Sequence, residues 1–365
     1  MRWVLTRIYV VRHCEAEGNA CRRSQTNYEG TVTTKGIAQS EALRIRFHNE
    51  KIDAVYSSDS YRARVTADPV AKDHGLLPKY RYLLREYRVG NWDGSANGNV
   101  YEDYPDVMKH NAEFPGDMYF PGGDTYGTIE CRCRYILNQI VKENPGKTVV
   151  LVSHALTIRV LLAIASGLPG TRINEIPYGD NTSVSLIEYD GSRYSVRFMS
   201  DNSHLPVEFR RSWNHDGSCD INLAVHTCDF AVDTEFIRKW KPSADIEGIR
   251  KNYEKNSDSA AVFLLSGKKC GFVALDFDNQ LGKDYLFVKD YCLDIPVEVA
   301  EYSLQAIGYA LHIARKNNIL FIAVPEPKTD VEKAVVSRFQ FEPVPGFPGY
   351  LRLGTLIPPC ELPVV

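Results

Sequence analysis

Residues 8–19 read Ile-Tyr-Val-Val-Arg-His-Cys-Glu-Ala-Glu-Gly-Asn, and the rest of the fold can be argued outward from this stretch. Its first four residues are apolar or β-favouring and predict a short buried strand. The strand ends in Arg12 and His13, followed by small and polar residues. Ligands bind beyond the strand ends of open α/β sheets, and an arginine beside a histidine there suits the binding and attack of a phosphate group. Because an isolated Arg-His pair is common, its interpretation depends on the residues that follow.

Two further predicted strands end in comparable side chains. Residues 52–58 end in Ser57-Ser58 shortly before Arg62, and residues 147–153 end in Ser153-His154. Helical patterns over 36–50, 61–67 and 157–166 separate the strands, and residues 181–191 and 194–199 predict a closing strand pair. Alternating strands and helices indicate a three-layer α/β fold with a mostly parallel sheet. In such a sheet the three strand ends share one edge, so two arginines and two histidines are expected to converge.

These residue types together predict phosphoryl chemistry. Two guanidinium groups can bind a phosphoryl group and neutralise its oxygens, while one neutral imidazole attacks phosphorus to form a phosphohistidine. The second imidazole can hydrogen-bond a phosphate oxygen. A carboxyl group is still needed to protonate the leaving alcohol and then deprotonate water, and residues 84–94 offer Glu86 and Asp93.

The same residues resemble, in order, the motifs of the histidine phosphatase (phosphoglycerate mutase-like) superfamily. Residues 12–15 with Asn19 resemble its R-H-G-E…N signature. The further matches are Thr33-x-x-Gly36-x-x-Gln39, Ser58-x-x-x-Arg62-Ala63-x-x-Thr66-Ala67, Leu84-x-Glu86-x-x-x-Gly90-x-Trp92-x-Gly94, Pro121-Gly122-Gly123-Asp124 and Val152-Ser153-His154. Each motif alone is weak, but their shared order over about half of the chain is specific.

The resemblance implies a role for each residue. His13 is expected to be the phosphorylated nucleophile and Glu86 the acid/base, with Arg12, Arg62 and His154 completing the phosphate pocket. The expected substrate-binding residues are Asn19, Arg23, Gln25 and Ala155. We interpret Asp93 as a turn residue after Trp92, and no cofactor or metal is expected.

Two departures from the family pattern bear on activity. Cys14 and Ala155 stand where the family has glycine; both are small, so the pocket is retained if neither backbone has a positive φ. The cofactor-dependent mutases have E-R-H-Y-G after the catalytic carboxylate and a longer lid, whereas this chain has Glu86-Tyr-Arg-Val-Gly. We therefore favour a phosphatase over a mutase-type phosphotransferase. The aromatic-rich residues 97–126 are expected to form a lid of a short helix and loops.

Composition restricts the class of protein. A formal net charge of -3 over 365 residues favours no nucleic-acid or membrane partner, and no apolar run reaches membrane-spanning length. We expect a cytoplasmic enzyme acting on a small phosphorylated substrate, for which a sugar or nucleotide phosphate is one class. The nine cysteines are scattered; Cys133 falls on the apolar helix face of residues 129–140, which favours free thiols.

The chain is long enough for two domains, and we place the boundary after the motifs. Residues 1–202 are the expected catalytic domain, 203–220 a linker and 221–365 a second α/β domain. In the last range, strands are predicted at 259–265, 269–277, 285–293, 319–324 and 350–353, with helices at 300–314 and 330–339.

This order of elements resembles the GNAT acetyltransferase fold. The family's cofactor loop, R/Q-x-x-G-x-G/A, would fall at residues 296–301, which lack both glycines and carry two carboxylates. The string Gln305-Ala-Ile-Gly308-Tyr-Ala310 matches but lies inside the predicted helix, so we interpret it as a coincidence. We expect a GNAT-like domain without acetyltransferase activity, serving as a substrate cover, a homodimer surface or a docking module. The alternatives are a bifunctional phosphatase/acetyltransferase and a non-catalytic phosphate-binding module.

Overall fold

The structure is a computed structural model that describes residues 5–210, 221–293 and 299–356. It separates into two compact units. The first unit contains Met1–Ala16, Gln25–Asp93 and Tyr104–Asp216, and the second contains Glu17–Ser24, Gly94–Asp103 and Gly217–Val365. Two short segments from the first third of the chain thus group with the C-terminal residues. Because residues 211–220 of the expected linker lie outside the described residues, the domain boundary stays a prediction.

The first unit is built on a mixed sheet with the strand order β3-β2-β4-β1-β5-β6. The strands are β1 Thr6–Arg12, β2 Ala54–Ser57, β3 Lys79–Tyr80, β4 Thr148–Ser153, β5 Val184–Tyr189 and β6 Tyr194–Asp201. Strands β3, β2, β4 and β1 are parallel, while β5 is antiparallel to both β1 and β6. The register pairs Arg12 with Ser153 and Ser57 with Val152, so three strand ends share one edge as predicted.

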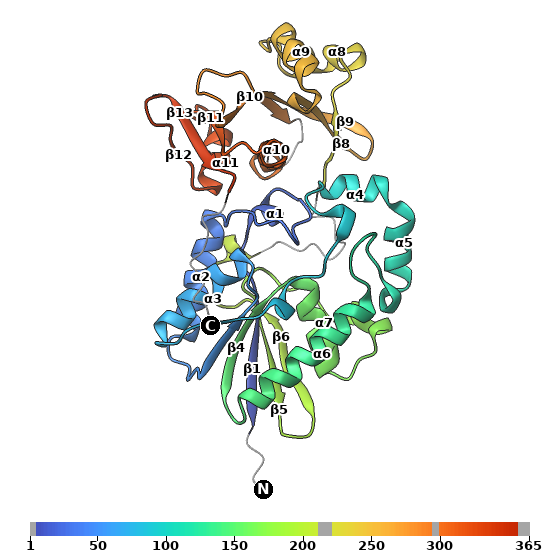
Figure 1. Cartoon of the computed structure of the whole chain (residues 1–365), viewed down its shortest axis with the longest axis vertical. Helices are drawn as coiled ribbons and strands as arrows, with labels where there is room; N and C mark the ends of the chain where they lie inside the picture. Colours follow the sequence, from blue (N-terminus) through green and yellow to red (C-terminus); the bar gives the residue numbers. More distant parts are fainter. Residues whose placement is uncertain (1–4, 211–220, 294–298, 357–365) are drawn as a thin grey trace. The chain divides into compact units, whose positions relative to one another are not determined.

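Helices cover both faces of this sheet. Figure 1 shows α2 (Thr34–Phe47) and α3 (Tyr61–Asp73) on one side, and α6 (Tyr126–Glu143) and α7 (Ala155–Ala165) on the other. Alternate residues of β1 explain the two layers, because Val11 packs with α2 and α3 while buried Ile8 and Val10 point to the opposite face. Residues 129, 133, 136, 137 and 140 of α6 are all buried, which confirms the predicted stripe.

Short elements connect the layers of the first unit. They are η1 Tyr82–Leu84, η2 Gly90–Trp92, α5 Pro105–Glu113, η3 Pro115–Asp117, η4 Gly170–Glu175 and η5 Val207–Phe209. The expected lid at 97–126 is divided, because α4 (Asn97–Asp103) groups with the second unit. In the first unit, Phe120 stacks on Tyr87 with ring centroids 4.4 Å apart, and Arg88 pairs with Asp124 at 2.9 Å. These contacts fasten residues 120–124 to the segment that follows Glu86.

The second unit has its own mixed sheet, with the order β12-β13-β11-β10-β9-β8-β7. The strands are β7 Ala224–Thr227, β8 Ala260–Leu265, β9 Lys268–Asp276, β10 Tyr285–Leu293, β11 Phe321–Pro325, β12 Glu342–Pro343 and β13 Tyr350–Gly354. Its helices are α1 Glu17–Ala20, α4, α8 Phe230–Trp240, α9 Ile246–Lys255, α10 Val299–Lys316 and α11 Asp330–Arg338. A further one-turn helix, η6, spans Ser257–Ser259. Hydrophobic patterns in the sequence predicted β8–β11, β13, α10 and α11, but not β7, α8, α9 and β12.

One pair of strands in this sheet is parallel. Strand β10 pairs with β11 only from Tyr285 to Phe287 and then continues alone beside β9, with a register shift between Val288 and Asp290. The hairpin predicted between β8 and β9 is confirmed; Ser266 and Gly267 both have positive φ, 51° and 74°, which closes a tight turn.

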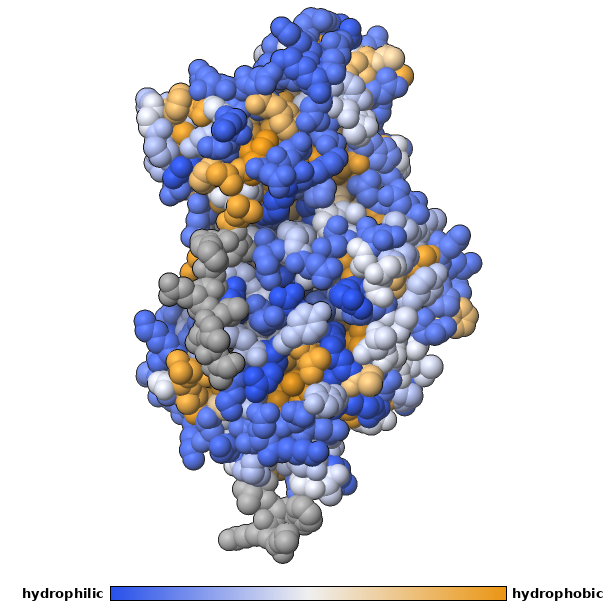
Figure 2. Space-filling model, in the orientation of Figure 1, coloured by the Kyte–Doolittle hydropathy of each residue, from blue (hydrophilic) through white to orange (hydrophobic). Residues whose placement is uncertain are grey.

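The cysteines, the possible metal-binding side chains and the helix lengths of the described residues complete the description of the fold. The seven cysteines among them are free, and these residues contain no group of His, Cys, Asp or Glu that could hold a metal ion. No helix in this part of the chain is long and apolar enough to span a membrane. Figure 2 shows mostly polar side chains on the face it views, with apolar side chains in small groups.

The start of α2 generates a testable prediction, because Thr33 is the N-cap and Thr34 the first residue of this helix. The Thr33 hydroxyl accepts the Gly36 amide at 2.9 Å and also bonds the Glu15 carboxylate at 2.7 Å. We expect Thr33→Ala to lower the free energy of unfolding by about 1–2 kcal/mol. Thr34→Ala serves as the matched control with a smaller loss, and urea denaturation of both variants measures the difference. Equal losses would contradict the cap assignment.

Candidate active site

His13 follows β1 and is buried, with 5% of its surface exposed. Its Nδ1 lies 2.7 Å from the carbonyl oxygen of Cys14. Since a carbonyl only accepts, Nδ1 carries the proton and Nε2 keeps its lone pair. Burial lowers the pKa of His13 well below its usual value, and the positive charges of Arg62 and Arg12 lower it further. The imidazole is therefore neutral, with its nucleophilic nitrogen unprotonated.

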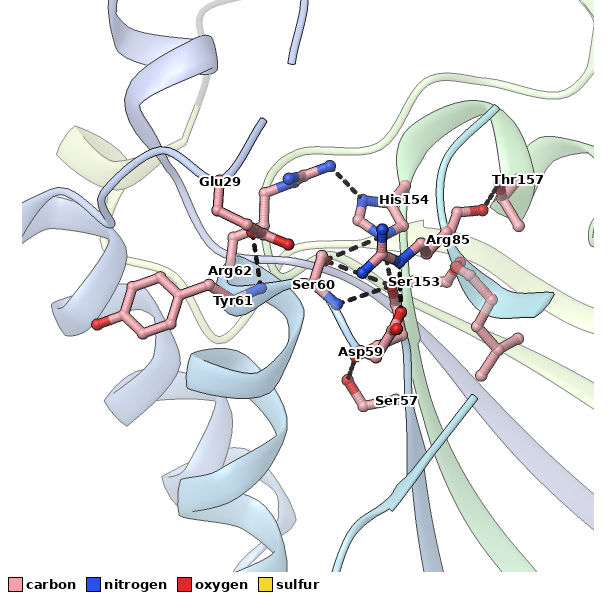
Figure 3. Close-up of polar contacts among 12 residues, drawn as sticks. Glu29, Ser57, Asp59, Ser60, Tyr61, Arg62, Arg85, Ser153, His154 and Thr157 are labelled. Carbon is pink, nitrogen blue, oxygen red and sulfur yellow. Dashed lines mark hydrogen bonds and ion pairs between the residues drawn. The ribbon is translucent and has the colours of Figure 1, made fainter. Parts of the chain in front are cut away.

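His154 lies at the end of β4, and hydrogen bonds fix its protonation state (Figure 3). A guanidinium only donates, so Arg62 Nη2 donates to Nδ1 at 3.1 Å. The proton of the neutral ring is then on Nε2 and is donated to Ser58 Oγ at 2.9 Å. Burial lowers the pKa of His154 well below its usual value, with Arg62 and His13 as the next causes. The His13 and His154 ring centroids are 5.0 Å apart.

The two arginines place positive charge at this edge of the sheet. Arg62, in the first turn of α3, also donates from Nη2 to the Gln25 carbonyl at 3.2 Å, while its buried Nη1 has no hydrogen-bond partner among the described residues. Burial lowers the pKa of Arg62. Arg12 donates from Nη1 to the Gly179 carbonyl at 2.7 Å. A buried donor without a partner costs free energy, and an anion at Arg62 Nη1 removes that cost.

Glu86 is held at the first turn of α7. Its carboxylate accepts the backbone amides of Leu156 at 3.2 Å and Thr157 at 3.1 Å, and Thr157 Oγ1 lies 3.0 Å away. The first amides of a helix lack intrahelical acceptors and favour negative charge, which explains this position. Because His154 is the N-cap of the same helix, Glu86 and His154 are fixed to one rigid element.

A second layer of polar contacts supports these groups (Figure 3). Glu29 accepts the Tyr61 amide at 2.9 Å at the start of α3, and its charge partly offsets the lowering of the Arg62 pKa. Arg85 donates to Asp59 at 2.6 Å, beside the serines that contact His154. The Glu29 cap and the Arg85–Asp59 ion pair hold the loops that precede Arg62, and they thereby help to fix the positions of Arg62 and His154.

The structure answers the question raised by the two missing glycines. Five non-glycine residues among those described have positive φ, and neither Cys14 nor Ala155 is one of them. The Cys14 amide donates to Thr66 Oγ1 at 2.8 Å, and its thiol is buried, which raises its pKa. A side chain at either position is therefore compatible with the backbone, and Cys14 is a packed, protonated thiol.

The remaining predicted site residues are distributed between the two units. Gln25 and Ala155 belong to the first unit, where Gln25 contacts Arg62 through its carbonyl and Ala155 begins α7. Asn19 and Arg23 belong to the second unit. Asp93 accepts the amides of residues 26, 27 and 28, which fits its interpretation as a structural turn residue.

Comparisons with known proteins agree with this geometry. The profile of the histidine phosphatase superfamily (branch 1) matches residues 8–202, which is more than half of the chain. The chain belongs to the histidine phosphatase superfamily. This membership and the relatives described next make it a phosphoric monoester hydrolase.

Its relatives in this superfamily include proteins named as phosphatases. Phosphoserine phosphatase 1 of Hydrogenobacter thermophilus is 26% identical over 55% of this chain and 95% of its own length. The metal-independent phosphoserine phosphatase of Arabidopsis thaliana is 29% identical over 55% of this chain and 84% of its own length. The solved structure of Bacillus stearothermophilus YhfR is 29% identical, with a TM-score of 0.52 over 55% of this chain and 98% of its own.

Some residues in this histidine phosphatase site were not among the predicted site residues. Ser58 and Thr157 contact His154 and Glu86, and Asn181 donates to the His13 carbonyl at 2.8 Å. Ser58 was visible as the first residue of a motif, and Thr157 as a residue in the first turn after a strand end. Asn181 carries no local signal, because its contact depends on the return of the chain at β5.

The two neutral histidines generate a prediction on stability. Because their folded-state pKa values are lowered below 6.5, the unfolded chain binds more protons as the pH falls below that value. We expect the free energy of unfolding to fall by up to about 1.4 kcal/mol per pH unit for each such histidine. Denaturation series above and below pH 6.5 measure the slope. His154→Gln should make it shallower, and an unchanged slope would contradict the assignment.

Proposed function

We propose that this protein is a metal-independent phosphomonoesterase that hydrolyses a small phosphorylated metabolite through a phosphohistidine at His13. The observation that carries the proposal is the protonation state of His13. Its Nδ1–H is engaged by the Cys14 carbonyl and its pKa is lowered, so Nε2 is available to attack phosphorus.

Binding of the phosphate group is the first step of the proposed reaction. A phosphate dianion neutralises the positive charge of Arg12 and Arg62, and it provides an acceptor for the buried Nη1 of Arg62. Its negative charge also raises the pKa of His154, because an anion favours the charged form of a neighbouring base. A protonated His154 can then donate to a phosphate oxygen in addition to Ser58.

Transfer of the phosphoryl group requires an acid on the leaving-group side. Glu86 donates a proton to the alcohol as His13 attacks, and the resulting carboxylate deprotonates the water that cleaves phosphohistidine. The amides of Leu156 and Thr157 hold this carboxylate in place in both steps. The two arginines stabilise the charge that spreads over the phosphoryl oxygens in the transition state.

The substrate is proposed as a class. Two of the curated relatives are named phosphoserine phosphatases, which makes O-phosphoserine a first compound to test. Sugar and nucleotide phosphates form the second group, because Tyr87, the chain neighbour of Glu86, stacks on Phe120 and so provides an aromatic pair. A screen of phosphorylated metabolites for released phosphate ranks these classes by kcat/KM.

The nucleophile generates a prediction. We expect His13→Ala to abolish hydrolysis of p-nitrophenyl phosphate and to form no acid-labile phosphoenzyme, because no other group can replace Nε2. Phosphoenzyme trapping by rapid acid-free quench and mass spectrometry measures the intermediate, which should be present in the wild-type protein. Normal turnover by His13→Ala would refute the mechanism. Failure of the wild-type protein to trap a phosphoenzyme with any substrate would favour a non-catalytic phosphate-binding module.

The acid/base generates a second prediction. We expect Glu86→Gln to reduce hydrolysis of alkyl phosphates by about 10²–10⁴-fold. With p-nitrophenyl phosphate, whose leaving group needs no proton, the first step should persist as a burst of one p-nitrophenol per enzyme. Glu130→Gln is the matched control, since this carboxylate pairs with Arg134 on the surface of α6. Equal losses for both substrates would contradict the role of Glu86 as a proton donor.

We also infer that the second unit has a GNAT-like fold without acetyltransferase activity. Support comes from its single parallel strand pair, in which β10 and β11 separate after three paired residues, and from α10, which connects these two strands. Residues 294–298, which include the start of the expected cofactor loop, lie outside the described residues. Titration of the full chain with acetyl-CoA should give no tight binding, and a micromolar affinity would favour the bifunctional alternative.

A further inference from the structure

The backbone of His13 is held on two sides, although strand β1 ends just before it, at Arg12. Its amide donates to the Ser153 carbonyl of β4 at 2.9 Å. On the other side of β1, the Thr182 amide donates to the Arg12 carbonyl at 3.0 Å and extends the contact with β5. The next carbonyl, that of His13, accepts instead from a side chain, Asn181 Nδ2, at 2.8 Å. An asparagine amide thus takes the place of a backbone donor.

The peptide group that joins His13 to Cys14 is also held at its nitrogen, by Thr66 of α3. The Cys14 amide donates to Thr66 Oγ1 at 2.8 Å, and the Thr66 hydroxyl donates to the Arg62 carbonyl at 2.7 Å. Since a hydroxyl has a single proton, Thr66 can donate to one of these groups and must accept from the other. The oxygen and the N–H of a trans peptide point in opposite directions, so Asn181 and Thr66 together oppose its rotation.

The orientation of this peptide determines where the imidazole of His13 points. The carbonyl that follows it, that of Cys14, lies 2.7 Å from His13 Nδ1 and accepts the proton of that nitrogen. If the peptide rotates, the Cys14 carbonyl moves with the chain, and the imidazole loses the acceptor that fixes its tautomer. Nε2 then has no fixed direction of attack, and a misplacement of about 1 Å can cost roughly 10²-fold in rate.

Asn181 lies in a segment that is anchored on both sides. Before it, Arg159 of α7 is buried and donates from Nε to the Ile176 carbonyl and from Nη2 to the Ile173 carbonyl, both at 2.8 Å. After it, Thr182 has a φ of 62°, a left-handed conformation that a β-branched residue keeps only where its surroundings impose it. All these residues belong to the first unit, so the arrangement is complete within one compact body.

We propose that Asn181 and Thr66 are positioning residues for the nucleophile: they form a clamp on the His13–Cys14 peptide and thereby aim His13 Nε2 at phosphorus. This inference rests on the proposed function, in which His13 is the phosphorylated group. Both side chains act through the backbone, so neither needs to touch the substrate. The clamp therefore affects phosphoryl transfer to His13, while binding of the phosphate group depends on the arginines.

Two pairs of variants of the full chain test the clamp. Thr66→Val removes the hydroxyl but keeps the shape of the side chain, whereas Thr66→Ser keeps an acceptor for the Cys14 amide. Asn181→Ala removes the amide donor, and Asn174→Ala is its matched control, because this exposed asparagine accepts from Arg159 at 3.3 Å in the same segment. For each variant, stopped flow measures p-nitrophenol release in the first turnover of p-nitrophenyl phosphate, and inhibition gives the Ki of inorganic phosphate.

We expect Asn181→Ala and Thr66→Val to slow the first turnover by about 10–10²-fold. The Ki of phosphate should stay at its wild-type value, because Arg12 and Arg62 still bind the anion. Thr66→Ser and Asn174→Ala should keep the wild-type rate. A wild-type rate in either folded clamp variant would overturn the proposal, and so would a Ki that rises as much as the rate falls. If Asn181→Ala does not fold, the comparison of Thr66→Val with Thr66→Ser decides.

The tautomer of His13 separates this inference from the proposed function, because it does not depend on turnover. Proton–nitrogen correlation spectra of histidine-labelled protein, assigned with His13→Ala, should show the Nδ1–H tautomer in the wild-type protein and both tautomers in the two clamp variants. An unchanged tautomer in these variants would overturn the clamp. A wild-type protein that forms no phosphoenzyme would refute the proposed function instead, and the spectra would still decide whether the clamp exists.

Discussion

The contact between Arg62 and His154 is the constraint on which the first unit depends. A buried guanidinium can only donate, so in this arrangement the imidazole facing it presents a lone pair and is neutral. That requirement fixes the proton on Nε2 and in turn explains why Ser58 lies against His154. The sheet fixes the two segments that carry Arg62 and His154 relative to each other. Ser57 of β2 and Val152 of β4 are paired in register a few residues before these side chains.

The same positive charge acts on His13, the nucleophile of the proposed reaction. Positive charge from Arg62 and Arg12 lowers its pKa in addition to burial, which keeps a nucleophilic lone pair at neutral pH. Burying positive charge beside neutral bases costs stability, and functional sites commonly carry such a cost. In the proposed function a phosphate group offsets this cost, since it supplies negative charge and acceptors to all these groups at once. The neutral state of both histidines beside two arginines therefore fits phosphoryl chemistry.

In the second unit, buried charge is neutralised by an opposite charge of the protein itself. There, Glu17 and Arg315 neutralise each other through two short hydrogen bonds, and the pair fastens a segment that continues directly from the nucleophile motif. Gly308 is required for the same packing because any side chain would collide with Cys21. The interleaving of two units along the chain follows from these contacts. Residues 17–24 and 94–103 therefore group with the C-terminal residues, although they lie in the first third of the chain.

Local patterns were sufficient for most of the fold. Period-two and period-3.6 hydrophobicity predicted β1, β2, β4 and the helices between them, because each of these elements buries one continuous face. Strand β7 and helices α8 and α9 were missed; β7 is only four residues long and has just one fully buried position. The domain boundary was drawn along the chain, since sequence patterns cannot report which distant segments pack together.

The sequence by itself determined the sheet, the edge at which three strands end and the identity of the groups that gather there, because strand direction and residue type are local properties. Only the tertiary structure decided the protonation states of His13 and His154, which depend on hydrogen-bond partners 1, 92 and 96 residues away. It also decided the partner of Glu17, which no local pattern connects to Arg315. Charge and hydrogen bonding act through space, so their consequences appear only when the chain is folded.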